Sequence, residues 1–210
     1  MDRDERADAR QRVLSVAGDL FAHHGFDDVT MAEIAEAAGV ARATVFNYFG
    51  SKYALVEAIT AGVLGAYRAM LDEALDDDTT PAPVLLEDLC EQMGKAIEAE
   101  REFFRGVFRD LGRVQLGLHE GEQIHGANDE IRSRLLQLIA RGQARNELSD
   151  DFSAQTLADA FHSLVNGTIT DWLYHDATAP LVARMRDAAG VFLRPVATAR
   201  PRSHRKRGSP

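Results

Sequence analysis

The sequence predicts an all-α protein of about nine helices. Apolar residues recur at intervals of three and four along almost every segment between residues 3 and 192, which is the spacing of one helical face. Short runs of Gly, Pro, Asp and Thr separate these segments, as in residues 76–81, and such runs form turns. Near the N-terminus, Thr30 and Glu33 have the spacing of a capping box, and Gly39 follows where a short helix would end.

Residues 30–52 (TMAEIAEAAGVARATVFNYFGSK) predict two short helices joined by a tight turn. Thr30 would cap the first helix, Gly39 allows the positive φ that ends it, and residues 42–49 form the second. Two helices of this size with a Gly-containing turn are typical of a helix-turn-helix, whose second helix lies in the DNA major groove. The apolar residues of this second helix that we expect to cover the core are Val45, Phe46 and Phe49.

The remaining side chains of the second helix suit contacts with DNA. Arg42 can bind guanine with two hydrogen bonds, Asn47 can bind adenine, and Thr44 can reach a base or a phosphate. Tyr48 and Lys52 suit phosphate contacts, which fix position rather than sequence. The alternative is a pair of packed helices whose polar face has no partner.

The run AGVARATVFNYFGSKYAL resembles the tetracycline-repressor (TetR) family of transcriptional regulators. The resemblance covers about residues 10–57 by motif, and extends to about residue 195 by length and helical character. It implies a three-helix DNA-binding domain followed by a helical domain that binds a small ligand and dimerises. Ala41 departs from the Ser or Thr often found there, which weakens any capping role at that position. The residues to which the resemblance assigns DNA contacts are Thr30, Arg42, Ala43, Thr44, Asn47, Tyr48 and Lys52.

We therefore expect a DNA-binding domain at residues 1–55, a ligand-binding and dimerisation domain at 56–196, and a basic, disordered tail at 197–210. The long helix that begins at Lys52 would connect the first two domains. The last two helices, at about residues 153–175 and 178–192, are more apolar than one bundle face requires. The resemblance implies that they form a four-helix interface with a second copy, and the alternative is an ordinary monomer core. Residues 117–128 contain three glycines and predict a loop or broken helix before a helix at 130–145.

Composition limits the class of protein. The chain of 210 residues has a net charge of −9, so any DNA contact must come from cations clustered at one end. The single cysteine, Cys90, excludes an intramolecular disulfide. No apolar run reaches 18 residues and the N-terminus is charged, so we expect a cytoplasmic protein with neither a membrane span nor a signal peptide.

Candidate ligand-binding residues lie on the helices between the connecting helix and the expected dimer face. Their side chains are mostly apolar or aromatic, with few polar groups, and suit a hydrophobic ligand. Each of them taken alone fits an ordinary core position equally well. The candidates are Tyr67, Met93, Phe103, Phe104, Phe108, Phe161, Asn166 and Trp172.

No enzyme motif is present: the sequence has no nucleophile elbow, no Gly-rich phosphate loop and no zinc-protease motif. His119, Glu122 and His125 have ligand-type side chains at steps of three, but three donors in a Gly-containing segment are weak evidence for zinc or nickel. We predict no metal and no cofactor. The sequence favours a homodimeric repressor that a small hydrophobic ligand releases from a palindromic operator. The alternatives are an activator, a ligand-independent regulator, or a ligand-binding protein without a DNA function.

Overall fold

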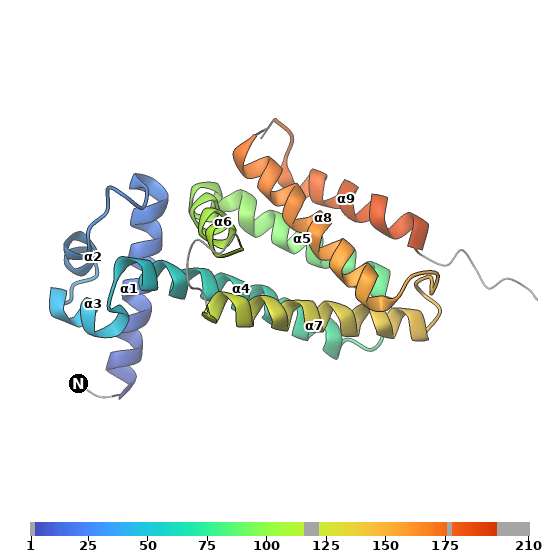
Figure 1. Ribbon diagram of the computed structural model, residues 1–210, viewed down its shortest axis with the longest axis horizontal. Coiled ribbons are helices and arrows are strands. Elements are labelled where there is room, and N and C mark those ends of the chain that lie inside the picture. Colours follow the sequence, from blue (N-terminus) through green and yellow to red (C-terminus); the bar gives the residue numbers. More distant parts are fainter. Residues whose placement is uncertain (1–2, 116–121, 176–177, 197–210) are drawn as a thin grey trace, which may run out of the picture.

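The computed structural model describes residues 3–115, 122–175 and 178–196, which form nine α-helices (Figure 1). The expected all-α class is confirmed. In chain order the helices are α1 (Arg3–His24), α2 (Met31–Ala37), α3 (Arg42–Phe49), α4 (Lys52–Asp76), α5 (Ala82–Ala99), α6 (Arg101–Gln115), α7 (Glu122–Ala144), α8 (Ala154–Tyr174) and α9 (Leu181–Val196).

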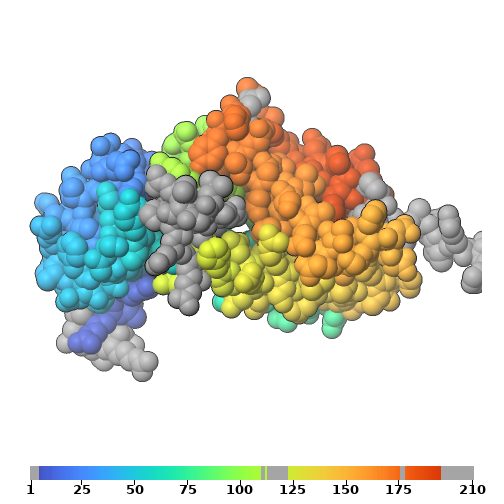
Figure 2. All heavy atoms as spheres, viewed as in Figure 1, coloured from blue at the N-terminus to red at the C-terminus, as the bar shows by residue number. Residues whose placement is uncertain are grey.

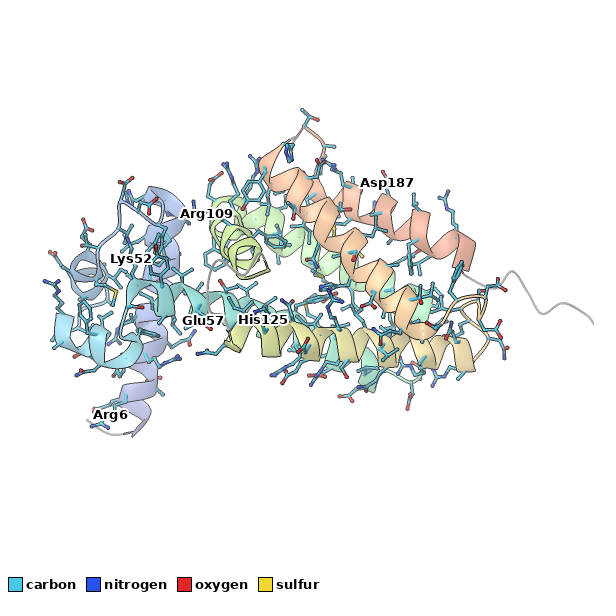
Figure 3. All side chains as sticks on the ribbon, viewed as in Figure 1. Arg6, Lys52, Glu57, Arg109, His125 and Asp187 are labelled. Carbon is cyan, nitrogen blue, oxygen red and sulfur yellow. The ribbon has the colours of Figure 1, made fainter. Side chains whose placement is uncertain are left out.

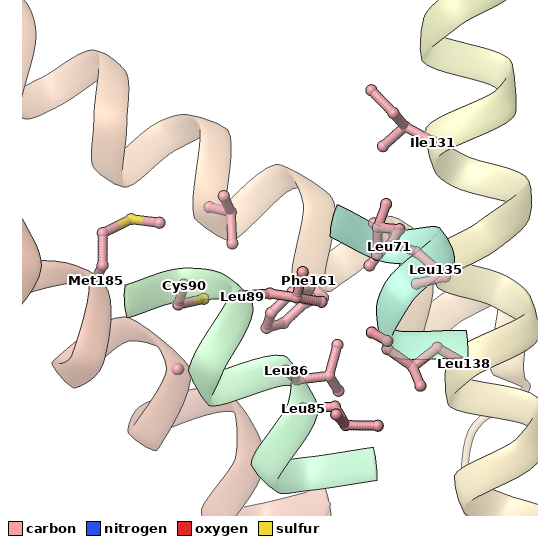
Figure 4. Close-up of a cluster of buried hydrophobic side chains, with 14 of the residues drawn as sticks. Leu71, Leu85, Leu86, Leu89, Cys90, Ile131, Leu135, Leu138, Phe161 and Met185 are labelled. Carbon is pink, nitrogen blue, oxygen red and sulfur yellow. The ribbon is translucent and has the colours of Figure 1, made fainter. Parts of the chain in front are cut away.

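Buried apolar side chains form two clusters. The first, which we call the N-terminal core, joins α1, α2, α3 and the start of α4, and it includes Ile34 and Leu55. The second, the body core, joins the rest of α4 to α5, α7, α8 and α9, and it includes Leu64, Leu135 and Phe161 (Figure 4). The helices of the N-terminal core form one end of an elongated molecule (Figures 1 and 2). The domain boundary at residue 55 stays a prediction.

Helix α4 runs from one core into the other. The Ser51 side chain caps its start by accepting a hydrogen bond from the Ala54 N–H at 3.1 Å. At its other end, the Arg141 guanidinium donates to the carbonyl oxygens of Ala74 and Leu75 at 2.9 and 2.8 Å, so these free helix-end carbonyls are satisfied. Among the described helices, α4 alone has the length and apolar composition of a membrane span. It packs against α1, α6 and α7, and 33% of its 18-residue apolar stretch is buried inside the structure.

The start of α7 corrects one expectation from the sequence. Residues 122–128 are a continuous part of α7, which spans Glu122–Ala144, rather than the expected loop or broken helix, and residues 117–121 lie outside the described residues. The Glu57 carboxylate on α4 accepts a hydrogen bond from the Gln123 backbone N–H at 3.3 Å, which satisfies a free donor at the helix start (Figure 3). Ile124 is fully buried and anchors the same turn, while Gly126 has open space around it. The Glu57 hydrogen bond and the burial of Ile124 are both tertiary interactions, so the local sequence did not predict them.

Helix α6 touches the N-terminal helices directly. A Cβ atom placed on Gly18 of α1 would lie 2.9 Å from Cε2 of Phe103 on α6, closer than side chains normally approach. A side chain at position 18 would therefore displace the Phe103 ring at this contact between α1 and α6. The N-terminal helices are thus joined to the body in two places, through α4 and through α6.

Candidate DNA-binding surface and ligand cavity

The predicted turn between α2 and α3 is present. At the start of α2, Thr30 and Glu33 form the expected capping box: the Thr30 N–H donates to the Glu33 carboxylate at 2.8 Å, and the Glu33 N–H donates to the Thr30 hydroxyl at 3.2 Å. The hydrogen bonds that the Thr30 N–H and the Thr30 hydroxyl donate to the Glu33 carboxylate lower the pKa of Glu33 below its usual value. At the other end, Gly39 has a φ of +66°, and the N–H groups of Gly39 and Val40 donate to the carbonyls of Glu36 and Ala35. This is a Schellman termination, which sets the angle at which α3 leaves.

Helix α3 exposes one face and buries the other. Val45 and Phe49 pack into the N-terminal core. Arg42, Ala43 and Asn47 are exposed, and Thr44 is half-buried. The N-cap residue Ala41 makes no side-chain cap, in line with its departure from the usual Ser or Thr. The exposed face thus carries the polar side chains that the sequence assigned to bases, and those contacts stay predictions.

Phe46 was wrongly expected to be in the core. Its side chain is 40 % exposed on the same face as Arg42, whose guanidinium lies 5.6 Å from the Phe46 ring centre. A guanidinium over an aromatic face is held there by a cation–π interaction. Phe46 therefore limits where the Arg42 side chain points, which the helical spacing alone did not indicate.

Lys52 has a structural role that the sequence did not indicate. Its ammonium group donates to the carbonyl oxygens of Phe26 at 2.6 Å and Val29 at 2.8 Å, and it lies 4.2 Å from the centre of the Phe26 ring. The half-buried side chain thus fastens the α1–α2 loop to the start of α4. A phosphate contact by Lys52 stays a prediction. To make it, the ammonium group would have to bind the phosphate while it also donates to the Phe26 and Val29 carbonyls, or release one of them.

Thr30 and Tyr48, two other candidate DNA-contact residues, have side chains that are engaged or buried within the protein. The Thr30 hydroxyl donates to the Glu33 carboxylate at 2.8 Å, so it already serves the cap of α2. The Tyr48 hydroxyl is buried, and it has no hydrogen-bond partner among the described residues. A buried hydroxyl without a partner is costly, so a phosphate contact by Tyr48 would require its side chain to turn outwards.

An apolar cavity of about 150 Å³ lies in the body between α4, α5, α6, α7 and α8. Five of the predicted ligand residues line it, namely Tyr67, Met93, Phe104, Phe108 and Asn166. Two polar lining residues, Asn128 and His162, were not predicted, because each reads in sequence as a lone polar residue on a mostly apolar helix. The remaining lining residues are Val63, Leu64, Ala66, Met70, Ala96, Ile97, Val107 and Ile131.

Three predicted ligand residues do not line this cavity. Phe103 packs at the junction of α1 and α6, against Gly18. Phe161 is in the body core, with its ring centre 5.2 Å from that of Phe192. Trp172 is buried, donates from its indole N–H to the Ala179 carbonyl at 3.0 Å, and is covered by the Arg101 guanidinium. These three side chains pack between helices away from the α4–α8 cavity, and a ligand contact by any of them stays a prediction.

Comparison with known proteins assigns the family. Residues 13–59 match the model of the bacterial regulatory proteins, tetR family. The chain is 32% identical over 158 residues to the HTH-type transcriptional repressor KstR2 of Rhodococcus jostii RHA1, covering 73% of this chain and 74% of the relative. The chain belongs to the TetR family.

Further similarities extend along the body. The HTH-type transcriptional repressor BepR of Brucella suis is 25% identical over 183 residues, which cover 85% of this chain and 87% of BepR. The structure of the regulator FadR from Bacillus subtilis in complex with stearoyl-CoA superposes with a TM-score of 0.71 at 16% identity, covering 87% of this chain and 97% of that one. The first similarity is to a named repressor, and the second shows a shared fold. The protein is thus a transcriptional regulator and not an enzyme.

The sequence contains three candidate side chains as metal donors, for which we predict no metal. His119 and the side chain of Glu122 lie outside the described residues, and His125 is exposed on the first turns of α7 (Figure 3). Within the described part of the chain, no three His, Cys, Asp or Glu side chains are grouped to hold a metal ion.

Two titratable side chains line the cavity, Tyr67 and His162, and the pKa of His162 is the closer of the two to neutral pH. Burial lowers its pKa to about 4, with Arg132 acting in the same direction and Asp159 opposing it. The Asn166 amide nitrogen lies 2.9 Å from Nε2 of His162, a distance that fits a hydrogen bond to a neutral imidazole. At neutral pH the cavity therefore presents an uncharged imidazole.

This lowered pKa makes stability depend on pH. As the pH falls below about 6.5, His162 becomes protonated in the unfolded chain, whereas in the folded chain it stays neutral until about pH 4. The unfolded state therefore binds more protons in this window, and the free energy of unfolding should fall as the pH is lowered through it. We expect the wild type to lose on the order of 1–2 kcal/mol more than His162→Gln between pH 7 and pH 5. Urea unfolding at both pH values measures this difference. Equal losses in the two proteins would show that His162 is not buried as described.

Proposed function

We propose that the chain is a homodimeric repressor that binds a palindromic operator and leaves it when a small, mainly hydrophobic ligand occupies the α4–α8 cavity. The observation that carries this proposal is the course of α4. Its first residue, Lys52, holds the α1–α2 loop of the DNA-binding end, and Leu64 and Tyr67 further along the same helix line the cavity. A ligand that displaces α4 would therefore shift α3 as well.

The two connections between the cavity and the DNA-binding end support the same proposal. Phe104 and Phe108 line the cavity from α6, and Phe103 on that helix contacts Gly18 of α1. The fold neighbour FadR was solved with stearoyl-CoA, which indicates that a body of this shape can hold an apolar group. If a ligand weakens DNA binding tenfold, DNA must weaken ligand binding tenfold, a coupling of about 1.4 kcal/mol.

In the proposed repressor, residues 1–55 would bind DNA, and residues 56–196 would bind the ligand and form the dimer. The tail at residues 197–210 lies outside the described part of the chain. The exposed α3 side chains of Arg42, Ala43 and Asn47 would read bases, with Thr44 at a base or a phosphate. Thr30, Tyr48 and Lys52 are proposed to position the helix at the phosphates. The protein would act in the cytoplasm, where its operator is accessible.

Selection from random DNA tests this function even though the operator sequence is unknown. The full-length protein selects duplexes from a random-sequence pool, and the enriched sequence is then footprinted. The proposal requires an enriched site with a two-fold repeat, because each α3 of a symmetric dimer meets one half-site. Enrichment of no sequence, or of a single unrepeated half-site, would contradict it.

Replacing Arg42 with alanine tests base reading by α3. The exposed guanidinium, held over Phe46, can bind a guanine edge with two hydrogen bonds, so its loss should cost about 1–3 kcal/mol at the selected site. Base preference should relax at one position of each half-site. Gel-shift titrations with single-base variants measure both effects. Arg68→Ala, on the body surface, is the matched control, and unchanged specificity in Arg42→Ala would remove Arg42 from base reading.

Replacing Val191 with aspartate tests the dimer. Helices α8 and α9 pack against each other, and Ala160 and Gly167 on α8 and Val191 on α9 are exposed. Val191 is 71 % exposed, so an aspartate there leaves the folded monomer intact but places an unpaired carboxylate in the proposed interface. Light scattering at micromolar concentration should show a dimer for the wild type and a monomer for Val191→Asp. Phe192 is unsuited to this test because it packs on Phe161.

A further inference from the structure

The chemistry of the cavity lining narrows the class of ligand. Among the residues that line the cavity there is no Asp, Glu, Lys or Arg. Its polar side chains are Tyr67, Asn128, His162 and Asn166, and the rest are aliphatic, aromatic or Met. Burial raises the pKa of Tyr67 and lowers that of His162, so both are neutral at pH 7. The cavity therefore offers apolar surface and a few uncharged hydrogen-bonding groups.

The size of the cavity sets the size of the ligand. Pockets for drug-sized ligands hold about 300–1,000 Å³, which is well above the 150 Å³ found here. An apolar protein cavity of about 150 Å³ binds benzene and otherwise stays dry. The space between Met93, Phe104 and Phe108 thus accommodates about one ring.

The polar groups at the cavity wall have unused hydrogen-bonding capacity. Asn166 donates to His162, which leaves its amide oxygen and its second N–H. No hydrogen bond of the Tyr67 hydroxyl or the Asn128 amide is found among the described residues, although both line the cavity. Polar groups that a ligand shields from water are costly unless the ligand pairs with them. A purely apolar ring would leave these groups unpaired.

A charged ligand would be poorly matched. The nearby charges of Arg132 and Asp159 lie outside the lining and pair with each other at 2.7 Å. A carboxylate in the cavity would lose its hydration and gain no cation in return, which is strongly unfavourable.

We propose that the cavity selects an uncharged single-ring molecule that bears one carbonyl, amide or hydroxyl group. The ring packs among Met93, Phe104 and Phe108, and the polar group pairs with Asn166 and its neighbours at the cavity wall. This inference rests on the proposed function only in treating the cavity as the effector site.

Isothermal titration of the full-length protein with benzamide, benzoate and toluene tests this selection. Benzamide and benzoate have nearly the same shape and differ in charge, so they isolate the effect of charge. We expect benzamide to bind at least about tenfold more tightly than benzoate. Equal affinities, or binding of neither benzamide nor toluene, would overturn the inference.

Variants locate the bound molecule. Asn166→Leu keeps the size of the side chain and removes its hydrogen-bonding groups, so benzamide should bind about tenfold more weakly while toluene binds unchanged. Gln137→Leu, on the exposed face of α7, is the matched control and should leave both affinities unchanged. Asn128→Leu is the second variant if Asn166→Leu does not fold. Weakening of both compounds to the same extent, or of neither, would contradict the assigned pairing.

Measurement of DNA binding without any compound separates this inference from the proposed function. Selection of an operator by a protein that ignores all three compounds would overturn the ligand class and leave DNA regulation standing. Preference for benzamide over benzoate by a protein that selects no DNA would confirm the ligand class and refute the proposed repressor.

Discussion

The Lys52→Met variant is expected to lose about 2–3 kcal/mol of folding stability in the absence of DNA. The ammonium group makes charged hydrogen bonds to the carbonyls of Phe26 and Val29 and lies over the Phe26 ring. A hydrogen bond to a charged group contributes about 1.5–3 kcal/mol, and an exposed cation–π contact contributes about 0.5–1 kcal/mol. Methionine keeps the aliphatic part of the side chain and removes both interactions.

This expectation separates two roles of Lys52. If the side chain only contacted phosphate, its removal would weaken DNA binding and leave the unfolding midpoint of the free protein unchanged. If it fastens the α1–α2 loop, the midpoint in urea should fall whether or not DNA is present. Lys95→Met, on the exposed surface of α5, is the matched control and should stay within about 0.5 kcal/mol of the wild type.

Replacing Phe161 with alanine should have the largest effect on stability, a loss of about 3–5 kcal/mol. Phe161 is 1 % exposed in the body core (Figure 4), and its ring packs at a tilt against the ring of Phe192. Truncation removes apolar contacts on every side and leaves a cavity that the surrounding helices cannot close. Calorimetry or urea unfolding measures the loss.

A second phenylalanine provides the control for Phe161. Phe152, between α7 and α8, is 59 % exposed, so Phe152→Ala should change the free energy of unfolding by about 0.5 kcal/mol or less. Similar unfolding midpoints for Phe161→Ala and Phe152→Ala would mean that the Phe161 side chain is not buried in the body core. The assignment of Phe161 to a ligand site stays a prediction, since Phe161 does not line the α4–α8 cavity.

Local features of the sequence determined the helices and the DNA-binding motif. The capping box of Thr30 and Glu33, the Ser153 cap of α8 and the termination at Gly39 each depend on residues within five positions of one another. Interactions over such short distances form in nearly the same way in any fold, so spacing and residue type suffice to predict them.

The partners of each side chain were decided by the tertiary structure. Helical spacing placed Phe46, Phe161 and Trp172 on apolar faces, but it does not say whether a face meets solvent, a core or a cavity. The start of α7 depends on Glu57, which is 66 residues away from the N–H it accepts. The Lys52 ammonium group donates hydrogen bonds to carbonyls of a loop more than twenty residues earlier in the chain. Periodicity identifies which residues share a face, whereas the packing of distant helices determines what that face touches, and only the folded chain fixes that packing.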